Sequence, residues 1–389
     1  MKFVDIYIEN YSSDKELNIV NYTIDFNSEE DVSAFLEAVN IKYESTKPKF
    51  YGLTLPYQGR NIMYAGSWYR FPLELLNDEK IQIVYVDENE EEEGGAFYWN
   101  KFKVEREVES FSSLLTSVET KDSKFATTTD ISPVDVATEL VVVNCGQGNW
   151  NEVRTNKHTV IYDLGASSRY SEKQIMNLIK HRFEKFSPKS VYVIISHWDM
   201  DHFQSLKYLS QDDLSKIIAV YGPTNVPSTL VYQDAIDNLA KNNVPFYLIP
   251  NTIRVGKTID LNLLISSDSI DLYRATNGRS RNQTGIVLAV KGHEKLALLT
   301  GDHHYCKILS AITGKYSKRK TLLVAPHHGG AAGNFSVDEW EKELSVEECA
   351  ISVGENSYNH PYEHYNNLED LTNSRPNRTD ECGDLVYLI

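Results

Sequence analysis

Hydrophobic and polar positions alternate in two segments near the start of the chain, Val4–Ile8 and Ile81–Val86. Alternation with a period of two residues is typical of a half-buried strand. Between these segments, Ser28 precedes three acidic residues, which is the pattern of an N-cap and first turn of a helix that continues to about Val39. We therefore predict a separate N-terminal α+β domain over residues 1–109.

The pattern changes after a polar stretch. Residues 110–137 are rich in Ser, Thr and Asp, with Pro133 near the end, and we interpret them as a linker. Beyond it, short apolar runs such as Val191–Ile195 alternate with segments of helical spacing such as Glu172–Phe183. This alternation predicts an α/β domain over residues 138–389, whose strands end in polar residues.

Charge and histidine are both distributed unevenly. Residues 1–137 carry 26 Asp and Glu against 13 Lys and Arg, whereas residues 138–389 carry 29 against 26, so most of the net charge of −16 lies in the N-terminal part. This acidity disfavours binding of a phosphate backbone there, and it leaves a protein as the possible partner of the N-terminal domain. All 11 histidines lie at or after His158. We therefore expect the chemistry in the second domain.

No apolar run approaches the roughly 18 residues that a membrane-spanning helix needs. The four cysteines are widely spaced and form no paired motif of the kind found in disulfide frameworks or zinc ribbons. These features predict a cytoplasmic protein that makes no membrane contact.

The densest group of chemically competent residues follows the apolar run Val191–Ile195. Within six residues, a buried strand delivers four potential metal ligands: His197, Asp199, Asp201 and His202. Alternate residues of an extended segment point to the same side, so one such segment can supply two metal ions. The alternative is that these are cap and turn residues, but later segments supply matching ligands.

Those later segments each place an acid or an imidazole just past an apolar strand. Asp302 is the natural bridging ligand, because a carboxylate has two oxygens for two metals. His327 or His328, together with His360, would complete the two coordination spheres. We choose His327 as the ligand because it comes first after the strand. His328 could then contact a phosphate oxygen or protonate the leaving group.

Other side chains have supporting or structural interpretations. Asp163 ends an apolar strand and is expected to orient the loop around the site rather than bind metal. Trp198 is expected to pack beneath the turn. Arg279, Arg281 and the run Lys315–Lys320 offer positive charge that could hold a nucleic-acid backbone, although a solvated basic face is the favoured interpretation. The sequence does not identify substrate-binding residues.

The order of these motifs resembles the metallo-β-lactamase fold, and more closely the hydrolase domain of ComEC-type competence proteins. The matching segments are NCGQG at 144–148, IYDLG at 161–165, SHWDMDH at 196–202, LTGD at 299–302, PHHG at 326–329, and His360-Pro361. The resemblance covers about residues 140–389. It implies a metallo-β-lactamase αββα sandwich, two divalent metal ions and phosphodiester hydrolysis. Asp199 stands where the wider signature has a second histidine, so β-lactam substrates fit poorly.

The charge of the expected site suits an anionic substrate. Two divalent ions and three carboxylates leave a net charge of about +1. Carboxylate-rich coordination accommodates manganese or iron beside zinc. We predict a two-metal-dependent phosphodiesterase, with a nuclease as the leading candidate, in which a metal-bridging hydroxide attacks and Asp201 helps to orient it. The alternatives are hydrolysis of a small phosphodiester (a cyclic nucleotide or a phosphocholine ester), or a protein-interaction or sensor component of a multi-protein, defence-type system.

Overall fold

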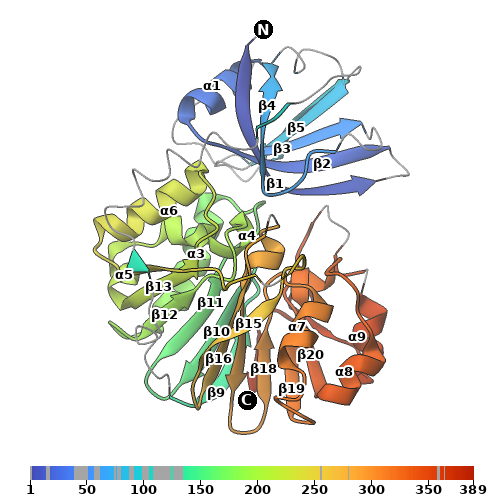
Figure 1. Ribbon diagram of the computed structural model, residues 1–389. Helices are drawn as coiled ribbons and strands as arrows, with labels where there is room; N and C mark the ends of the chain where they lie inside the picture. Colours follow the sequence, from blue (N-terminus) through green and yellow to red (C-terminus); the bar gives the residue numbers. More distant parts are fainter. Residues whose placement is uncertain are drawn as a thin grey trace.

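The computed structural model describes an N-terminal part with gaps and a nearly continuous second part. The described residues are 2–14, 18–38, 51–56, 62–73, 76, 80–86, 92–98, 105–107, 124–125 and 135–389, without 255, 279, 357–359 and 363. The N-terminal sheet lies against one end of a larger body of two sheets and their helices (Figure 1).

The N-terminal part is an antiparallel sheet covered by one helix. Its strand order is β6-β5-β3-β2-β1-β4-β7, and the helix α1 (Glu29–Ala38) begins after Ser28, whose hydroxyl accepts a hydrogen bond from the backbone N–H of Asp31. The apolar side of α1 shares one core with residues of β1 and β2. The strands are β1 (Phe3–Asp14), β2 (Ile19–Phe26), β3 (Tyr51–Pro56), β4 (Ser67–Pro72), β5 (Lys80–Val86), β6 (Glu92–Tyr98) and β7 (Glu105–Glu107).

The second part contains two mixed sheets. The first has the order β22-β9-β10-β11-β12-β13-β14-β8 and the second the order β15-β16-β17-β18-β19-β20-β21. The first sheet consists of β8 (Lys124–Phe125), β9 (Ala137–Val142), β10 (Trp150–Thr155), β11 (Thr159–Leu164), β12 (Val191–Ile194), β13 (Ile217–Pro223), β14 (Phe246–Ile249) and β22 (Leu385–Leu388). The second consists of β15 (Leu261–Ser266), β16 (Ile270–Ala275), β17 (Ile286–Lys291), β18 (Leu296–Leu299), β19 (Lys320–Val324), β20 (Ser345–Ile351) and β21 (Asn377–Arg378).

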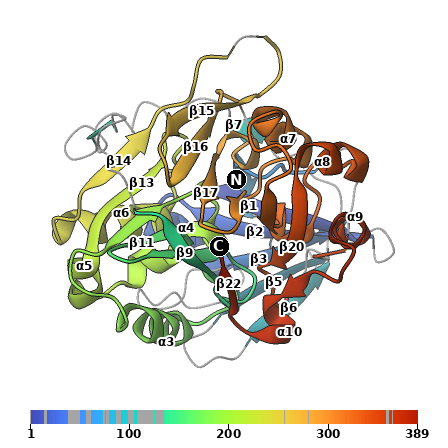
Figure 2. The same cartoon turned by 90° about the horizontal axis from the view of Figure 1, so that it is seen from below.

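Helices cover the outer face of each sheet. Figure 2 shows α3 (Glu172–Phe183), α5 (Gln211–Lys216) and α6 (Leu230–Lys241) beside the first sheet, and α7 (Tyr305–Ile312), α8 (Val337–Glu343) and α9 (Tyr365–Thr372) beside the second. Shorter segments are α4 (Met200–Phe203), α10 (Thr379–Cys382), and the 3-10 turns η2 (Gln204–Tyr208), η3 (Asn282–Thr284) and η4 (Pro326–Gly329).

Three apolar layers hold this arrangement together. Alternate residues of β9 face opposite ways: Leu140 and Val142 belong to the core between the two sheets, whereas Val141 belongs to the core beneath the helices of the first sheet. A third core lies between the second sheet and its helices. Burial of both faces explains why the strands read as nearly continuous apolar runs. The predicted αββα sandwich is confirmed.

The segment that we interpret as a linker contributes one described strand. Lys124–Phe125 pairs in parallel with β14 at the edge of the first sheet. The first strand of the continuous second part, β9, begins at Ala137. Residues 110–123 and 126–134 of the predicted linker lie outside the described residues.

Within the described ranges, no helix has both the length and the apolar character needed to cross a membrane.

Trp198 packs beneath the turn that follows β12, as expected. Its side chain is fully buried, its indole N–H donates to the carbonyl of Pro223 at 2.7 Å, and its ring contacts the rings of Phe203 and Tyr232 edge-on. Gly222 leaves room for it, because a Cβ there would lie 2.2 Å from the indole. Trp198 therefore anchors the turn to the core.

We predict that Trp198→Ala lowers the free energy of unfolding by about 3–5 kcal/mol, because it removes a fully packed indole and leaves a cavity. Chemical denaturation followed by circular dichroism measures this change. The control is Val386→Ala on the exposed face of β22, where the side chain is 59% exposed and the expected change is within about 0.5 kcal/mol. Equal stabilities of the two variants would contradict this role for Trp198.

Candidate metal centre

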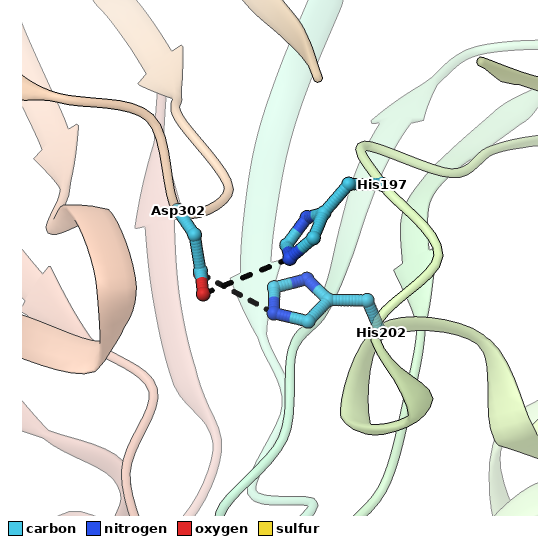
Figure 3. A group of neighbouring side chains, drawn as sticks. All are labelled: His197, His202 and Asp302. Carbon is cyan, nitrogen blue, oxygen red and sulfur yellow. Dashed lines mark ion pairs between the residues drawn. The ribbon is translucent and has the colours of Figure 1, made fainter. Parts of the chain in front are cut away.

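Side chains from both sheets meet where their parallel strands end. His197 and His202 follow β12 in the first sheet, and Asp302 follows β18 in the second. Figure 3 shows both imidazoles pointing at the Asp302 carboxylate. The Nε2 atom of His202 lies 3.3 Å from Asp302 Oδ1, and that of His197 lies 3.7 Å from Asp302 Oδ2. One potential ligand atom of each residue lies within 4.8 Å of the other two.

A second group of potential ligands shares His202 with the first. It consists of Asp201, His202 and His328, with ligand atoms again within 4.8 Å of one another. His328 Nε2 lies 3.3 Å from Asp201 Oδ2, and His202 Nε2 lies 3.9 Å from Asp201 Oδ1. His202 therefore belongs to both groups of donors, whereas Asp302 belongs to the first.

Asp199 and His327 lie at the edge of the first group. Asp199 Oδ2 is 3.3 Å from His197 Nε2, and His327 Nδ1 is 3.3 Å from Asp302 Oδ2. The His327 side chain is 18% exposed, whereas that of His328 is 4% exposed. Their backbones both take left-handed conformations, with φ of 53° and 54°.

Several of these donors have no hydrogen-bond partner among the described residues. They include the Nε2 atoms of His197, His202 and His328 and the Oδ1 atom of Asp302, all of them buried. Asp199 Oδ1 also lacks a hydrogen bond but forms an ion pair with Arg281. A buried polar atom that forms no hydrogen bond is costly. Imidazole nitrogens and carboxylate oxygens are donors that divalent metals accept, so the residues present fit a metal centre.

Contacts of the Nδ1 atoms explain why the Nε2 atoms of the three histidines face the site. His328 Nδ1 donates to the carbonyl of Ser352 at 2.7 Å, and His202 Nδ1 lies 2.8 Å from Asp163 Oδ2. His197 Nδ1 lies 2.9 Å from the hydroxyl of Ser196. A proton held on Nδ1 leaves the Nε2 lone pair available for a ligand.

Asp163, at the end of β11, lies beneath the site. Its carboxylate accepts from the backbone N–H of Ser196 at 2.5 Å and from the Asn149 amide at 2.7 Å, as well as contacting His202. Its backbone has a φ of 61°. Few residues other than glycine adopt this left-handed backbone conformation, although Asp does so more readily than most. Such conformations cluster at functional sites. Asp163 thereby orients His202 and the start of the ligand-bearing loop.

His360 lies outside both groups. Its Nδ1 accepts from the Gln147 amide at 3.2 Å, and its ring centroid lies 5.1 Å from that of His327 and 6.0 Å from that of His328. Gly330 makes room for this ring, because a Cβ there would lie 2.2 Å from His360 Nε2. Burial, reinforced by the two neighbouring imidazoles, lowers the pKa of His360 to about 2.

The carboxylates of the site are held in their charged form. Burial opposes ionisation of Asp302, but His327, His202 and His197 together hold its pKa well below the usual value. Burial also opposes ionisation of Asp199, but the positive charges of Arg281 and His197 outweigh this effect and lower the pKa of Asp199. Both carboxylates are therefore negative donors at neutral pH.

Two contacts at the site carry no signal in the sequence. Asn282 in η3 donates to Asp302 Oδ2 at 3.1 Å and lies 3.4 Å from His327 Nδ1. Arg281 is 7% exposed and forms ion pairs with Asp199 and with Glu9 of the N-terminal sheet. Both residues stand in a polar loop before β17, where nothing in the local pattern indicates metal chemistry.

The basic residues considered for a nucleic-acid backbone are mostly engaged elsewhere. The interpretation of Arg281 as part of a solvated basic face is wrong, because its side chain is buried and ion-paired. Lys315 pairs with Asp271 and Lys320 with Glu347, each at 2.9 Å. Arg279 lies outside the described residues.

No protein-family model matches this sequence, and no curated protein matches it. Solved structures that resemble it include the short form of human tRNase Z (11% identity, 61% of this chain and 89% of that chain, TM-score 0.34). Another is the metallo-β-lactamase fold protein YhfI from Bacillus subtilis (12% identity, 65% of this chain and 100% of that chain, TM-score 0.38). A third is a diphosphatase of the PhnP family (12% identity, 64% of this chain and 98% of that chain, TM-score 0.36). Structural similarity this weak does not identify the reaction. The reaction has to be inferred from the side chains of this chain.

We predict that Asp163→Asn weakens metal binding by about 10–100-fold, because replacing the carboxylate removes the acceptor that orients His202. Titration calorimetry with Mn²⁺ measures the affinity. Asp384→Asn is the control, since its carboxylate also pairs with a buried residue, Arg182, but lies away from the ligands. Unchanged Mn²⁺ affinity in Asp163→Asn would show that the contact with His202 has no influence on the site.

Proposed function

We propose that this chain is a two-metal-dependent phosphodiesterase. The observation that carries the proposal is that buried donors without a hydrogen-bond partner among the described residues gather in two groups that share His202, with Asp302 in the first. We assign His197, Asp199 and Asp302 to one ion, and we assign Asp201, His202, His328 and Asp302 to the other. Asp302 suits the bridging position because Oδ1 faces His202 while Oδ2 faces His197.

The two consecutive histidines exchange their expected roles in this assignment. His328 is the more buried, and its Nε2 lies among the donors without a hydrogen-bond partner. His327 is more exposed and sits beside Asp302. We therefore propose His328 as the ligand and His327 as the group that contacts a phosphate oxygen or protonates the leaving group. His360, which lies beyond both groups, would form a wall of the site.

Bound at these positions, two divalent ions would lower the pKa of a water molecule and neutralise the oxygens of a phosphodiester. The chain's own residues do the remaining work. Asp201 is 21% exposed in its side chain and lines a small cavity beside Asp199, so it can accept a hydrogen bond from the attacking water and orient it. The buried histidines and Asp302 exclude competing water from the metal side.

Two substrate classes remain, and different observations favour them. The resemblance to the ComEC-type hydrolase domain favours nucleic acid. The cavity does not favour a polymer, because its lining includes Glu9, Asp199 and Asp201 and no Lys or Arg. A polymer would need cationic groups along its backbone. We propose the nuclease reaction as the first to test and a small phosphodiester, such as a cyclic nucleotide, as the second.

The deciding experiment offers labelled single- and double-stranded DNA and RNA, and cyclic dinucleotides, to protein loaded with Mn²⁺ or Zn²⁺. We expect hydrolysis of at least one of them. Asp201→Asn should lower the rate at least about 100-fold. Removing a metal ligand should reduce activity more than removing a residue that only orients a ligand, for which the loss is about 10–100-fold.

The matched control is Asp212→Asn on α5, whose side chain is 79% exposed, and its rate should equal that of the unaltered protein. Equal product from the Asp201→Asn variant would indicate a contaminating enzyme. Absence of turnover on every substrate, with metal bound, would instead favour a sensor or interaction component that engages a protein through the acidic N-terminal domain.

A further inference from the structure

The N-terminal sheet reaches the candidate metal centre through Arg281. We infer that Glu9 of β1 and Arg281 are positioning residues for Asp199, so that the N-terminal domain completes the metal centre and forms one wall of the cavity beside Asp199. This inference rests on the metal-binding part of the proposed function.

Arg281 makes contacts on three sides. One guanidinium nitrogen, Nη2, lies 2.7 Å from Asp199 Oδ1 and 3.0 Å from Glu9 Oε2. The other, Nη1, donates to the carbonyl of Trp198 at 2.5 Å. The guanidinium carbon lies 4.7 Å from the centroid of the Tyr7 ring. The two residues from β1 therefore hold Arg281 against the loop that carries the ligands.

These contacts determine which oxygen of Asp199 faces the donors. Arg281 engages Oδ1, while Oδ2 is left 3.3 Å from His197 Nε2. A planar guanidinium fixes the orientation of a carboxylate more tightly than a flexible ammonium does. Arg281, Glu9 and Asp199 are all less than 9% exposed, so little solvent screens the attraction between Arg281 and the charged Asp199. Burial raises the pKa of Glu9, against the opposing charge of Arg281, and Glu9 Oε2 accepts a hydrogen bond from the guanidinium.

A second contact keeps β1 and β2 in place against the hydrolase domain. Asp25 of β2 accepts from the backbone N–H of Val231 at 3.4 Å, at the start of α6. Leu230, the first residue of α6, packs against the apolar core of the N-terminal sheet. The position of Glu9 is thus set by a docked domain rather than by one ion pair.

The same domain contributes to the cavity beside the ligands. Glu9, Asn10 and Thr23 of the N-terminal sheet line it together with residues of the hydrolase domain. The hydrolase side supplies Gln147, Ser168, Asp199, Met200 and Asp201. A water molecule in this cavity, beside Asp199 and Asp201, therefore touches both domains.

A merely structural ion pair between the domains would have a different signature. It would contribute to thermal stability and leave metal affinity unchanged. A positioning role instead weakens the affinity for the ion that Asp199 binds. The loss expected for a group that orients a ligand is about 10–100-fold.

The test uses the full chain and measures Mn²⁺ binding by calorimetry beside the thermal midpoint. We expect the unaltered protein to bind two ions. Glu9→Gln and Arg281→Met should weaken one ion at least about 10-fold and spare the other, and Arg281→Lys, which keeps the charge, should recover part of the loss. Asp5→Asn is the control, since Asp5 lies on the same strand and pairs with Arg70 away from the site.

A lower thermal midpoint with both affinities unchanged would overturn the inference, and so would an unaltered protein that binds no Mn²⁺. If Arg281→Met does not fold, Glu9→Gln decides, because it keeps the shape of the side chain. Loss of affinity in these variants without phosphodiesterase activity in the unaltered protein would leave the inference standing and refute the proposed reaction. Full activity with unchanged affinities would refute the inference alone.

Discussion

The structure brings together a group of buried polar atoms that have no hydrogen-bond partner among the described residues. Three imidazole nitrogens and one carboxylate oxygen meet where the two sheets of the sandwich come together. Each such atom costs roughly 1–3 kcal/mol when it is left unsatisfied. The fold tolerates this cost because strands of both sheets end at the same place, so that the donors converge, and two divalent ions would satisfy them together.

The surrounding architecture maintains this convergence. Asp163 fixes the ring of His202 and the backbone of Ser196, and Trp198 anchors the loop between them to the core. Gly165 permits the close approach of the ligand loop, because a Cβ there would lie 1.7 Å from the carbonyl oxygen of Asp201. The Arg281 side chain adds a contact from the N-terminal sheet. The site is therefore shaped by both sheets of the sandwich and by the N-terminal sheet.

Local patterns in the sequence predict the strands that carry the site and the ligand candidates that directly follow them. Apolar runs locate β12 and β18, and the residues just beyond them include His197, His202 and Asp302, which meet in space. The roles of His327 and His328 are not predictable in the same way. Both take left-handed backbone conformations, so the order in which they leave β19 does not indicate which ring faces the donors. The pairing of Arg281 with Glu9 spans 272 residues, and no local pattern encodes it.

The central claim is that two divalent ions occupy the space between the sheets. Anomalous diffraction from crystals grown with Mn²⁺ tests this claim most directly. The account predicts two peaks about 3.5–4 Å apart, bridged by Asp302, with His197 and Asp199 at one peak and Asp201, His202 and His328 at the other. A single ion, ions held elsewhere, or no anomalous signal at these side chains would contradict it.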